Sequence, residues 1–158
     1  HWVEDAGHYV VEDAHERILD WIGEAREAGA EILAGGEVED GLIRPTAIGN
    51  APPELKVSCD EVFGPVVTVN AVDSLDEAIE LANSTRYGLQ AGIFTGAIVN
   101  AMRAAQKLEF GGVTVNEAPT FRTDQMPYGG VKDSGNTREG PAYTVRELTE
   151  DRLVVLDL

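Results

Sequence analysis

The sequence has 158 residues, and its 28 Asp and Glu against 12 Lys and Arg give a formal net charge of -16. This length predicts one domain or a large piece of one, and an apolar fraction of 43% is enough to form a core. The charge argues against nucleic acid and anionic membrane surfaces as partners, because both would repel the chain. No apolar run approaches the roughly 20 residues of a membrane span, and the first ten residues do not resemble a signal peptide.

The same acidity leaves two interpretations of the setting open. One is an ordinary acidic cytoplasmic protein, and the other is a protein from a salt-loving organism, where concentrated salt screens the self-repulsion. The only cysteine, Cys59, cannot form an internal disulfide. That fits a reducing compartment, so we expect a cytoplasmic protein.

The first half of the chain opens with a predicted amphipathic helix over residues 10–28, where apolar side chains recur at three- and four-residue spacing. Gly29 predicts its end. The following segments are predicted from short apolar runs broken by Gly and Pro: a strand at 31–34, a polar turn at 37–41, an extended segment at 42–48, a break at 50–53, a stretch without period at 54–65 and a buried strand at 66–72.

The second half begins with a capping box, in which the Ser74 hydroxyl can accept from the Glu77 amide and thereby start a helix. The later segments are, in chain order, a strand at 89–95, a helix at 97–108 with Ile98, Ala101, Met102 and Ala105 as its inner stripe, a strand at 113–116, a long loop at 117–140 and a terminal strand at 153–158. Alternating strands and helices predict an α/β fold with a parallel sheet.

Metal and phosphate sites find little support in the sequence. His1, His8 and His15 are seven residues apart, which on a helix is about 10.5 Å and too far for one ion. The acidic cluster within residues 73–80 is better explained as a solvated helix face. Glycine motifs for nucleotides and a nucleophile elbow do not occur. We therefore predict no metal site.

One loop, DEVFGPVV at residues 60–67, combines acidic, aromatic, Gly and Pro residues just before a strand. Glu61 could accept hydrogen bonds from two ribose hydroxyls, and Phe63 could offer a flat apolar surface to a ring. The plainer alternative is a surface carboxylate and a core phenylalanine. Cys59 could be a nucleophile, but two neighbouring carboxylates disfavour a thiolate, so an incidental cysteine is the better interpretation.

Residues 60–66 resemble the E-E-[IV]-F-G-P-V signature of aldehyde dehydrogenases. Further stretches follow in that family's order: AIELAN at 78–83, YGL at 87–89, AGIFT at 91–95, GGVTVN at 111–116, PYGGVK at 127–132, SG at 134–135, EG at 139–140 and LTE at 148–150. The resemblance covers residues 12–158, whereas residues 1–10 do not look like the family. It implies an α/β fold: a three-layer, parallel-sheet fragment of the catalytic domain over 11–145, then a terminal oligomerisation strand over 146–158.

The resemblance also implies roles for individual residues. Glu61 matches the residue that holds the nicotinamide ribose hydroxyls of NAD or NADP, and Phe63 matches the aromatic residue beside the nicotinamide. Asn116, Phe121 and Arg122 stand where the family lines its aldehyde entrance. Arg122 could pair with an anionic aldehyde, such as a semialdehyde or a phosphorylated one. The alternative is an interface arginine that pairs with a surface carboxylate.

The family's cysteine nucleophile belongs to a G-Q-x-C motif upstream of the matched segment, and Cys59 does not match it. We therefore expect no catalytic residue in this chain. The prediction is a C-terminal fragment of an NAD(P)-dependent aldehyde dehydrogenase whose full-length parent is a homo-oligomer and converts an aldehyde to a carboxylate through a cysteine thioester. The isolated chain is expected to be inactive. Alternatives are a non-catalytic assembly module and a small-ligand-binding module.

Overall fold

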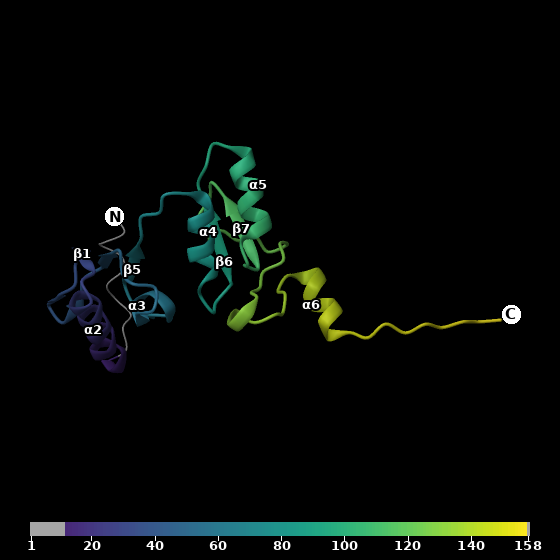
Figure 1. The fold of residues 1–158 in the computed structure, drawn as a ribbon. Helices are drawn as coiled ribbons and strands as arrows, with labels where there is room; N and C mark the ends of the chain where they lie inside the picture. The colour runs from purple at the N-terminus through teal and green to yellow at the C-terminus, as the bar shows by residue number, and fades with distance from the viewer. Residues whose placement is uncertain (1–11, 158) are drawn as a thin grey trace. The chain divides into compact units, whose positions relative to one another are not determined.

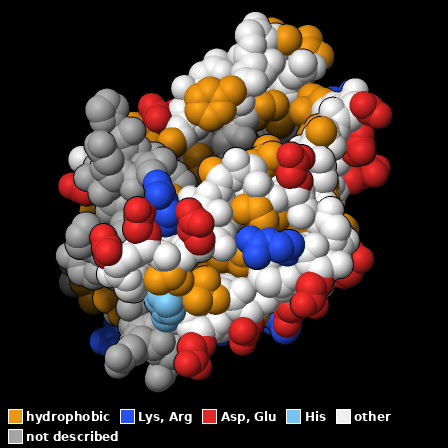
Figure 2. Space-filling view, turned by 90° about the vertical axis from the view of Figure 1, so that its left-hand side faces the viewer, with side chains coloured by type: hydrophobic (Ala, Val, Ile, Leu, Met, Phe, Trp, Pro, Cys, Tyr) orange, Lys and Arg blue, Asp and Glu red, His pale blue; other side chains and the backbone are white. Residues whose placement is uncertain are grey.

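A computed structural model describes residues 12–157, so the predictions on His1 and His8 lie outside the described residues. The chain divides between Asp73 and Ser74 into two compact units, which we call unit 1 and unit 2 (Figure 1). None of the described helices is long and apolar enough to cross a membrane. On the face drawn in Figure 2, acidic side chains are spread over the surface instead of forming one patch.

Unit 1 packs one long helix against a small mixed sheet. Its elements are, in chain order, α2 (Glu12–Glu27), β1 (Glu31–Ala34), β2 (Val38–Glu39), β3 (Leu42–Ile43), β4 (Thr46–Gly49), α3 (Lys56–Cys59) and β5 (Val66–Val69). The sheet has the order β1-β4-β5, in which β4 pairs antiparallel with β1 and parallel with β5. β2 and β3 form a separate hairpin.

The predicted apolar face of α2 forms the core of unit 1. Ile18, Ile22 and Ala25 are at most 2% exposed, and Ile48 of β4 is fully buried in the same cluster. Burying side chains of this size is the main source of stability in a unit this small. The helix ends at Glu27, and Gly29 has a φ of +90°, so the predicted glycine stop is confirmed.

Four details of unit 1 differ from the sequence prediction. The predicted polar turn at 37–41 contains the strand β2. The extended segment 42–48 is divided in two at Pro45, which cannot donate to a strand ladder. The four-residue helix α3 was missed, because one turn is too short to show a period. The strand at 66–72 ends at Val69 and is not buried on both faces, since Val67 and Val69 are 42% and 50% exposed. It is an edge strand with one covered face.

Unit 2 contains a strand–helix–strand unit followed by a long loop and a helix. Its elements are, in chain order, α4 (Leu75–Asn83), β6 (Gln90–Ile93), α5 (Ile98–Lys107), β7 (Gly112–Val115), the 3₁₀ helix η1 (Lys132–Ser134) and α6 (Pro141–Leu148). β6 and β7 pair in parallel, as expected for strands joined by a helix. The Ser74 hydroxyl accepts from the Glu77 amide at 3.2 Å, so this half of the predicted capping box is confirmed.

The inner face of α5 was predicted correctly at Ala101 and wrongly at the other three positions. Ala101 and Ala104 are buried, whereas Ile98 and Met102 are 72% and 53% exposed, and Ala105 is exposed as well. Apolar residues occur on both sides of this helix, so spacing alone did not decide which side faces inward. The side that meets α4 and β7 carries alanines, and a cavity of about 120 Å³ remains beside Ala104.

The predicted terminal strand does not form in the described chain. Residues 146–148 belong to α6, and residues 149–157 contain no strand (Figure 1). The exposed fractions of Leu153 and Val155 are 88% and 80%. A strand needs a neighbour for its backbone N–H and C=O groups, and the described part of this chain supplies none. The oligomerisation role of the segment stays a prediction.

Candidate functional site

The loop over residues 60–65 is attached to both the helix and the sheet of unit 1. Arg17 of α2 donates to the Val62 carbonyl oxygen at 2.8 Å, and its guanidinium lies over the Trp21 ring, 4.7 Å from the centroid. Gly64 touches the Ile18 side chain so closely that an added Cβ would clash with it. The Thr46 amide of β4 donates to the Pro65 carbonyl oxygen at 2.8 Å. These contacts fix the backbone of the loop.

The two side chains that the sequence singles out are both exposed. Phe63 is 73% exposed and has a φ of +48°, so the interpretation as a core phenylalanine is wrong. A bulky residue is uncommon in this left-handed region, which costs about 1 kcal/mol. Glu61 is exposed, and no hydrogen bond or ion pair joins its side chain to the described residues.

Chemically, this pair fits the ribose and nicotinamide of NAD or NADP. A carboxylate has two acceptor oxygens, which suits two adjacent hydroxyl groups. An exposed phenyl ring suits the face of an aromatic heterocycle. Cys59 is a different case, because its thiol donates to the Glu54 carbonyl oxygen at 3.6 Å within the α3 region. This local contact agrees with an incidental cysteine.

Asn116, the first candidate in unit 2, is used structurally. Its side-chain amide accepts from the Thr95 amide at 2.8 Å and donates to the Thr95 carbonyl oxygen at 3.0 Å. Its own amide donates to the Ile93 carbonyl oxygen at 2.8 Å, and its φ is +57°. Asn116 therefore joins the ends of β6 and β7 and fixes the point where the long loop starts. Phe121, the second candidate, is 47% exposed on that loop.

Arg122, the third candidate, already has a carboxylate partner. It donates to the Glu139 carboxylate at 2.6 Å, and its guanidinium lies 4.3 Å from the centroid of the Tyr128 ring. The Tyr128 and Glu139 backbones exchange two hydrogen bonds, of 3.1 and 2.6 Å. The alternative hypothesis for Arg122 is an interface arginine paired with a surface carboxylate. Arg122 does pair with a carboxylate, but that carboxylate belongs to the same chain. The arginine side chain is still 44% exposed.

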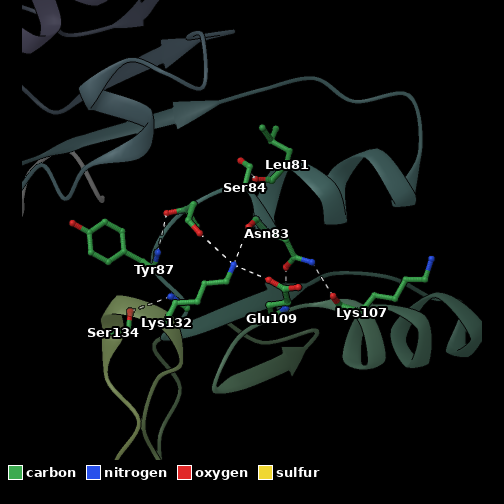
Figure 3. Close-up of polar contacts among 10 residues, drawn as sticks. Leu81, Asn83, Ser84, Tyr87, Lys107, Glu109, Lys132 and Ser134 are labelled. Atoms are coloured by element: carbon green, nitrogen blue, oxygen red, sulfur yellow. Dashed lines mark hydrogen bonds and ion pairs between the residues drawn. The ribbon is translucent and has the colours of Figure 1, made fainter.

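A polar cluster around Lys132 was missed by sequence reasoning (Figure 3). The Lys132 ammonium donates to the carbonyl oxygens of Asn83 and Thr85 and contacts the Glu109 carboxylate. The sequence contained only an indirect signal, the family motif around residues 127–132, and no local pattern predicts partners nearly 50 residues away. Within the described chain, no group of three His, Cys, Asp or Glu side chains lies together as a metal site would require.

The exposed glutamate and aromatic residue on an anchored loop of this α/β chain form a candidate ligand site. Comparison with known sequences identifies the family: the chain belongs to the aldehyde dehydrogenase family, whose sequence model matches residues 4–154. The matched range includes residues 4–10, which the motifs alone had not aligned.

Curated relatives extend well beyond the matched segment. The chain is 48% identical to the 3-sulfolactaldehyde dehydrogenase of Priestia aryabhattai over 90% of its own length and 30% of that protein. It is 44% identical to the lactaldehyde dehydrogenase of Methanococcus maripaludis strain S2 over 96% of its own length and 32% of that protein. The chain therefore spans about a third or less of the length of these relatives.

Solved structures give the same result for the fold. Aldehyde dehydrogenase 21 of Physcomitrella patens, in complex with succinate, superposes with a TM-score of 0.84 at 42% identity, over 88% of this chain and 29% of that one. Glyceraldehyde-3-phosphate dehydrogenase GapN of Methanocaldococcus jannaschii, in complex with NADP, superposes with a TM-score of 0.80 at 37% identity, over 86% of this chain and 29% of that one. The α/β class is thereby confirmed.

Proposed function

We propose that this chain is the C-terminal part of an NAD(P)-dependent aldehyde dehydrogenase and supplies part of its cofactor and aldehyde sites. In the parent reaction a cysteine outside this chain would form a thioester with the aldehyde carbon, for which bound NAD(P)+ would supply the oxidant, and water would then release the carboxylate and free the cysteine. No residue of this chain is proposed to form the covalent bond. Without that nucleophile the isolated chain is inactive.

The observation that carries the proposal is the anchored loop with its two exposed side chains. Glu61 is proposed to accept the nicotinamide ribose hydroxyls, and Phe63 to pack beside the nicotinamide ring. Arg17 and the close contact between Ile18 and Gly64 hold the loop before any cofactor is present. A loop that is ordered in advance loses less conformational entropy when it binds.

The substrate class is proposed to be an anionic aldehyde. Arg122 is the reason, because a guanidinium can bind a carboxylate, sulfonate or phosphate through two parallel hydrogen bonds. The names of some relatives and solved structures agree with this choice, since 3-sulfolactaldehyde, sulfoacetaldehyde, glyceraldehyde 3-phosphate and the product succinate carry an anionic group, whereas lactaldehyde, betaine aldehyde and indole-3-acetaldehyde in other names do not. Asn116 and Phe121 are proposed to shape the same entrance, Asn116 through its fixed backbone.

The proposal also includes a setting and an assembly. We propose a cytoplasmic location, and a homo-oligomeric parent in which the C-terminal segment pairs with a neighbouring subunit. The exposed apolar run from Leu153 to Leu156 favours such a contact, because it finds no cover within the described chain. We also propose a salt-rich environment, because concentrated salt would screen the repulsion within this acidic chain.

The test compares the isolated chain with a longer protein made from the same gene, including the coding region upstream of His1. The longer protein is expected to reduce NAD+ or NADP+ with an aldehyde, whereas the isolated chain is expected to form no NAD(P)H. Turnover by the isolated chain would contradict its proposed inactivity. An upstream region without a G-Q-x-C motif, or a longer protein without dehydrogenase activity, would contradict the parent function.

The assembly module is the second candidate function, and the exposed Leu153–Leu156 run is the observation that favours it. Analytical ultracentrifugation of the isolated chain separates the candidates. Self-association that depends on the C-terminal run, with no binding of NADH, supports an assembly module. Binding of NADH by the isolated chain supports a small-ligand-binding module instead.

A further inference from the structure

The Lys132 ammonium makes two hydrogen bonds to backbone carbonyl groups and one ion pair. It lies 2.8 Å from the Asn83 carbonyl oxygen, 3.2 Å from the Thr85 carbonyl oxygen and 2.9 Å from the Glu109 carboxylate. Figure 3 shows these acceptors converging on one nitrogen. An ammonium has three donors and one positive charge, and here two donors go to carbonyl oxygens while the charge is paired with a carboxylate. The side chain is 23% exposed, less than either cation of the Arg86–Asp133 and Arg122–Glu139 pairs.

The acceptors bring two helix ends together. Asn83 is the last residue of α4, where unpaired carbonyl groups concentrate negative potential. Its side-chain amide donates to the Lys107 carbonyl oxygen at 2.8 Å and accepts from the Glu109 amide at 2.9 Å, so it also holds the end of α5. Lys132 therefore binds a preformed junction of α4 and α5 and attaches the long loop to it.

The backbone around Lys132 follows the chain that enters β6. The Val131 amide donates to the Gly88 carbonyl oxygen, and the Asp133 amide donates to the Arg86 carbonyl oxygen, both at 3.0 Å. The Gly88 amide donates in turn to the Ser134 hydroxyl at 3.0 Å. Lys132 itself has a φ of +54°, an uncommon value for a residue with a side chain. In this conformation its ammonium reaches two carbonyl oxygens and the Glu109 carboxylate.

The segment anchored in this way ends at the two partners of Arg122. Tyr128 stands just before residues 129–138 and Glu139 just after them, and their backbones are hydrogen-bonded to each other. Tyr128 supplies the ring under the Arg122 guanidinium, and Glu139 supplies its carboxylate. A shift of the segment would therefore move both partners of Arg122 together.

We propose that Lys132 is a positioning residue for Arg122: it anchors the base of the loop that presents the guanidinium to an anionic aldehyde. The inference rests on the proposed function of Arg122 and adds a residue that does not touch the substrate. If Lys132 had only a structural role, its substitution would lower stability and would change the affinity for anionic and neutral aldehydes equally.

The first experiment uses the longer protein and compares succinic semialdehyde with propanal, which lacks an anionic group. Lys132→Met is expected to raise KM for succinic semialdehyde by about tenfold while changing KM for propanal and kcat by less than about twofold. Lys132→Arg is expected to restore part of the loss. Arg122→Ala is expected to give the same split, and the double variant to be no worse than Arg122→Ala alone, since both changes affect one interaction. Equal changes in KM for the two aldehydes would overturn the proposal.

The second experiment uses the 158-residue chain and separates this proposal from the proposed function, since it needs no activity. Hydrogen exchange at the Tyr128 and Glu139 amides is expected to accelerate by about tenfold or more in Lys132→Met. Lys107→Met is the matched control, because the Lys107 side chain points away from Lys132 (Figure 3), and it is expected to leave both amides unchanged. Unchanged exchange in Lys132→Met would overturn the positioning role whatever the enzyme assays give.

Discussion

The loops that carry the candidate site residues are held in different ways in the two units. In unit 1, residues 60–65 rest on the buried side chain of Ile18, with hydrogen bonds from the Arg17 side chain and the Thr46 amide. In unit 2, residues 117–140 are held mainly by polar contacts, which include backbone hydrogen bonds of Val131 and Asp133 and the side-chain contacts of Lys132 and Arg122 with exposed partners.

This difference predicts different sensitivities. Apolar packing is not weakened by ionic screening, whereas exposed ion pairs weaken as salt is added, since the Debye length falls from about 10 Å at 0.1 M to about 3 Å at 1 M. A rigid platform suits a cofactor loop that binds the same group in every turnover. A loop held by polar contacts can be changed by a few substitutions, which suits a region that decides substrate specificity.

The largest effect is expected from Ile18→Ala. The side chain is fully buried and touches Gly64, so the substitution should lower the stability of unit 1 by about 3 kcal/mol and release the loop. Hydrogen exchange of peptides from α2 and residues 60–66 measures both effects. Ile79→Ala in α4 is the matched control, since it should affect unit 2 and leave these peptides unchanged. If Ile18→Ala or Ile79→Ala raised hydrogen exchange equally in both units, the two units would not unfold independently.

Arg17→Met is expected to have an intermediate effect. It removes the bond to the Val62 carbonyl oxygen and the contact with Trp21, which together should cost about 1.5 kcal/mol. Exchange at the loop amides should rise, while the α2 core remains protected. Denaturant unfolding monitored by Trp fluorescence measures the loss, and a change below the error of the fit would mean that packing alone holds the loop.

Ser74→Ala removes the hydroxyl that caps α4, and is expected to cost about 1 kcal/mol. The loss should appear in exchange at the first turn of α4 and in the thermal unfolding of unit 2. Ser74→Asp should retain most of the stability, because a carboxylate can accept from the same amide. Equal losses in both variants would argue against the cap.

The smallest effect is expected from Glu139→Gln. Both partners of the Arg122 pair are largely exposed, so the loss should be about 0.5 kcal/mol at low salt and should vanish in molar KCl.

The wild-type chain itself should melt at a higher temperature in molar KCl, because salt screens the repulsion within its net charge of -16. A melting temperature that is independent of KCl would contradict the proposed preference for salt.

Sequence reasoning located most of the regular elements because their signals are local. The period of α2, its glycine stop and the Ser74 cap all depend on residues within one or two turns. The inner face of α5 was not predictable in this way, since Ile98 and Met102 are as apolar as a core requires and only the packing shows that Ala104 lies inside.

The contacts that shape the candidate site are of long range in sequence. Arg17 and Val62 are separated by 45 residues, and Lys132 and Asn83 by 49. No period or motif encodes such pairs. The family signature nevertheless identified Glu61 and Phe63 as candidates, and the structure adds that both are exposed on a loop with a fixed backbone.

The most direct test of the central claim is the KM for NAD(P)+ of the longer protein when Glu61 is changed to Gln. Glu54→Gln is the matched control, an exposed glutamate of the same unit outside the loop. The account predicts that Glu61→Gln raises this KM by about tenfold, through the loss of charge-assisted bonds to the ribose, and that Glu54→Gln leaves it unchanged. An unchanged KM in Glu61→Gln would contradict the assignment of residues 60–65 as a cofactor loop.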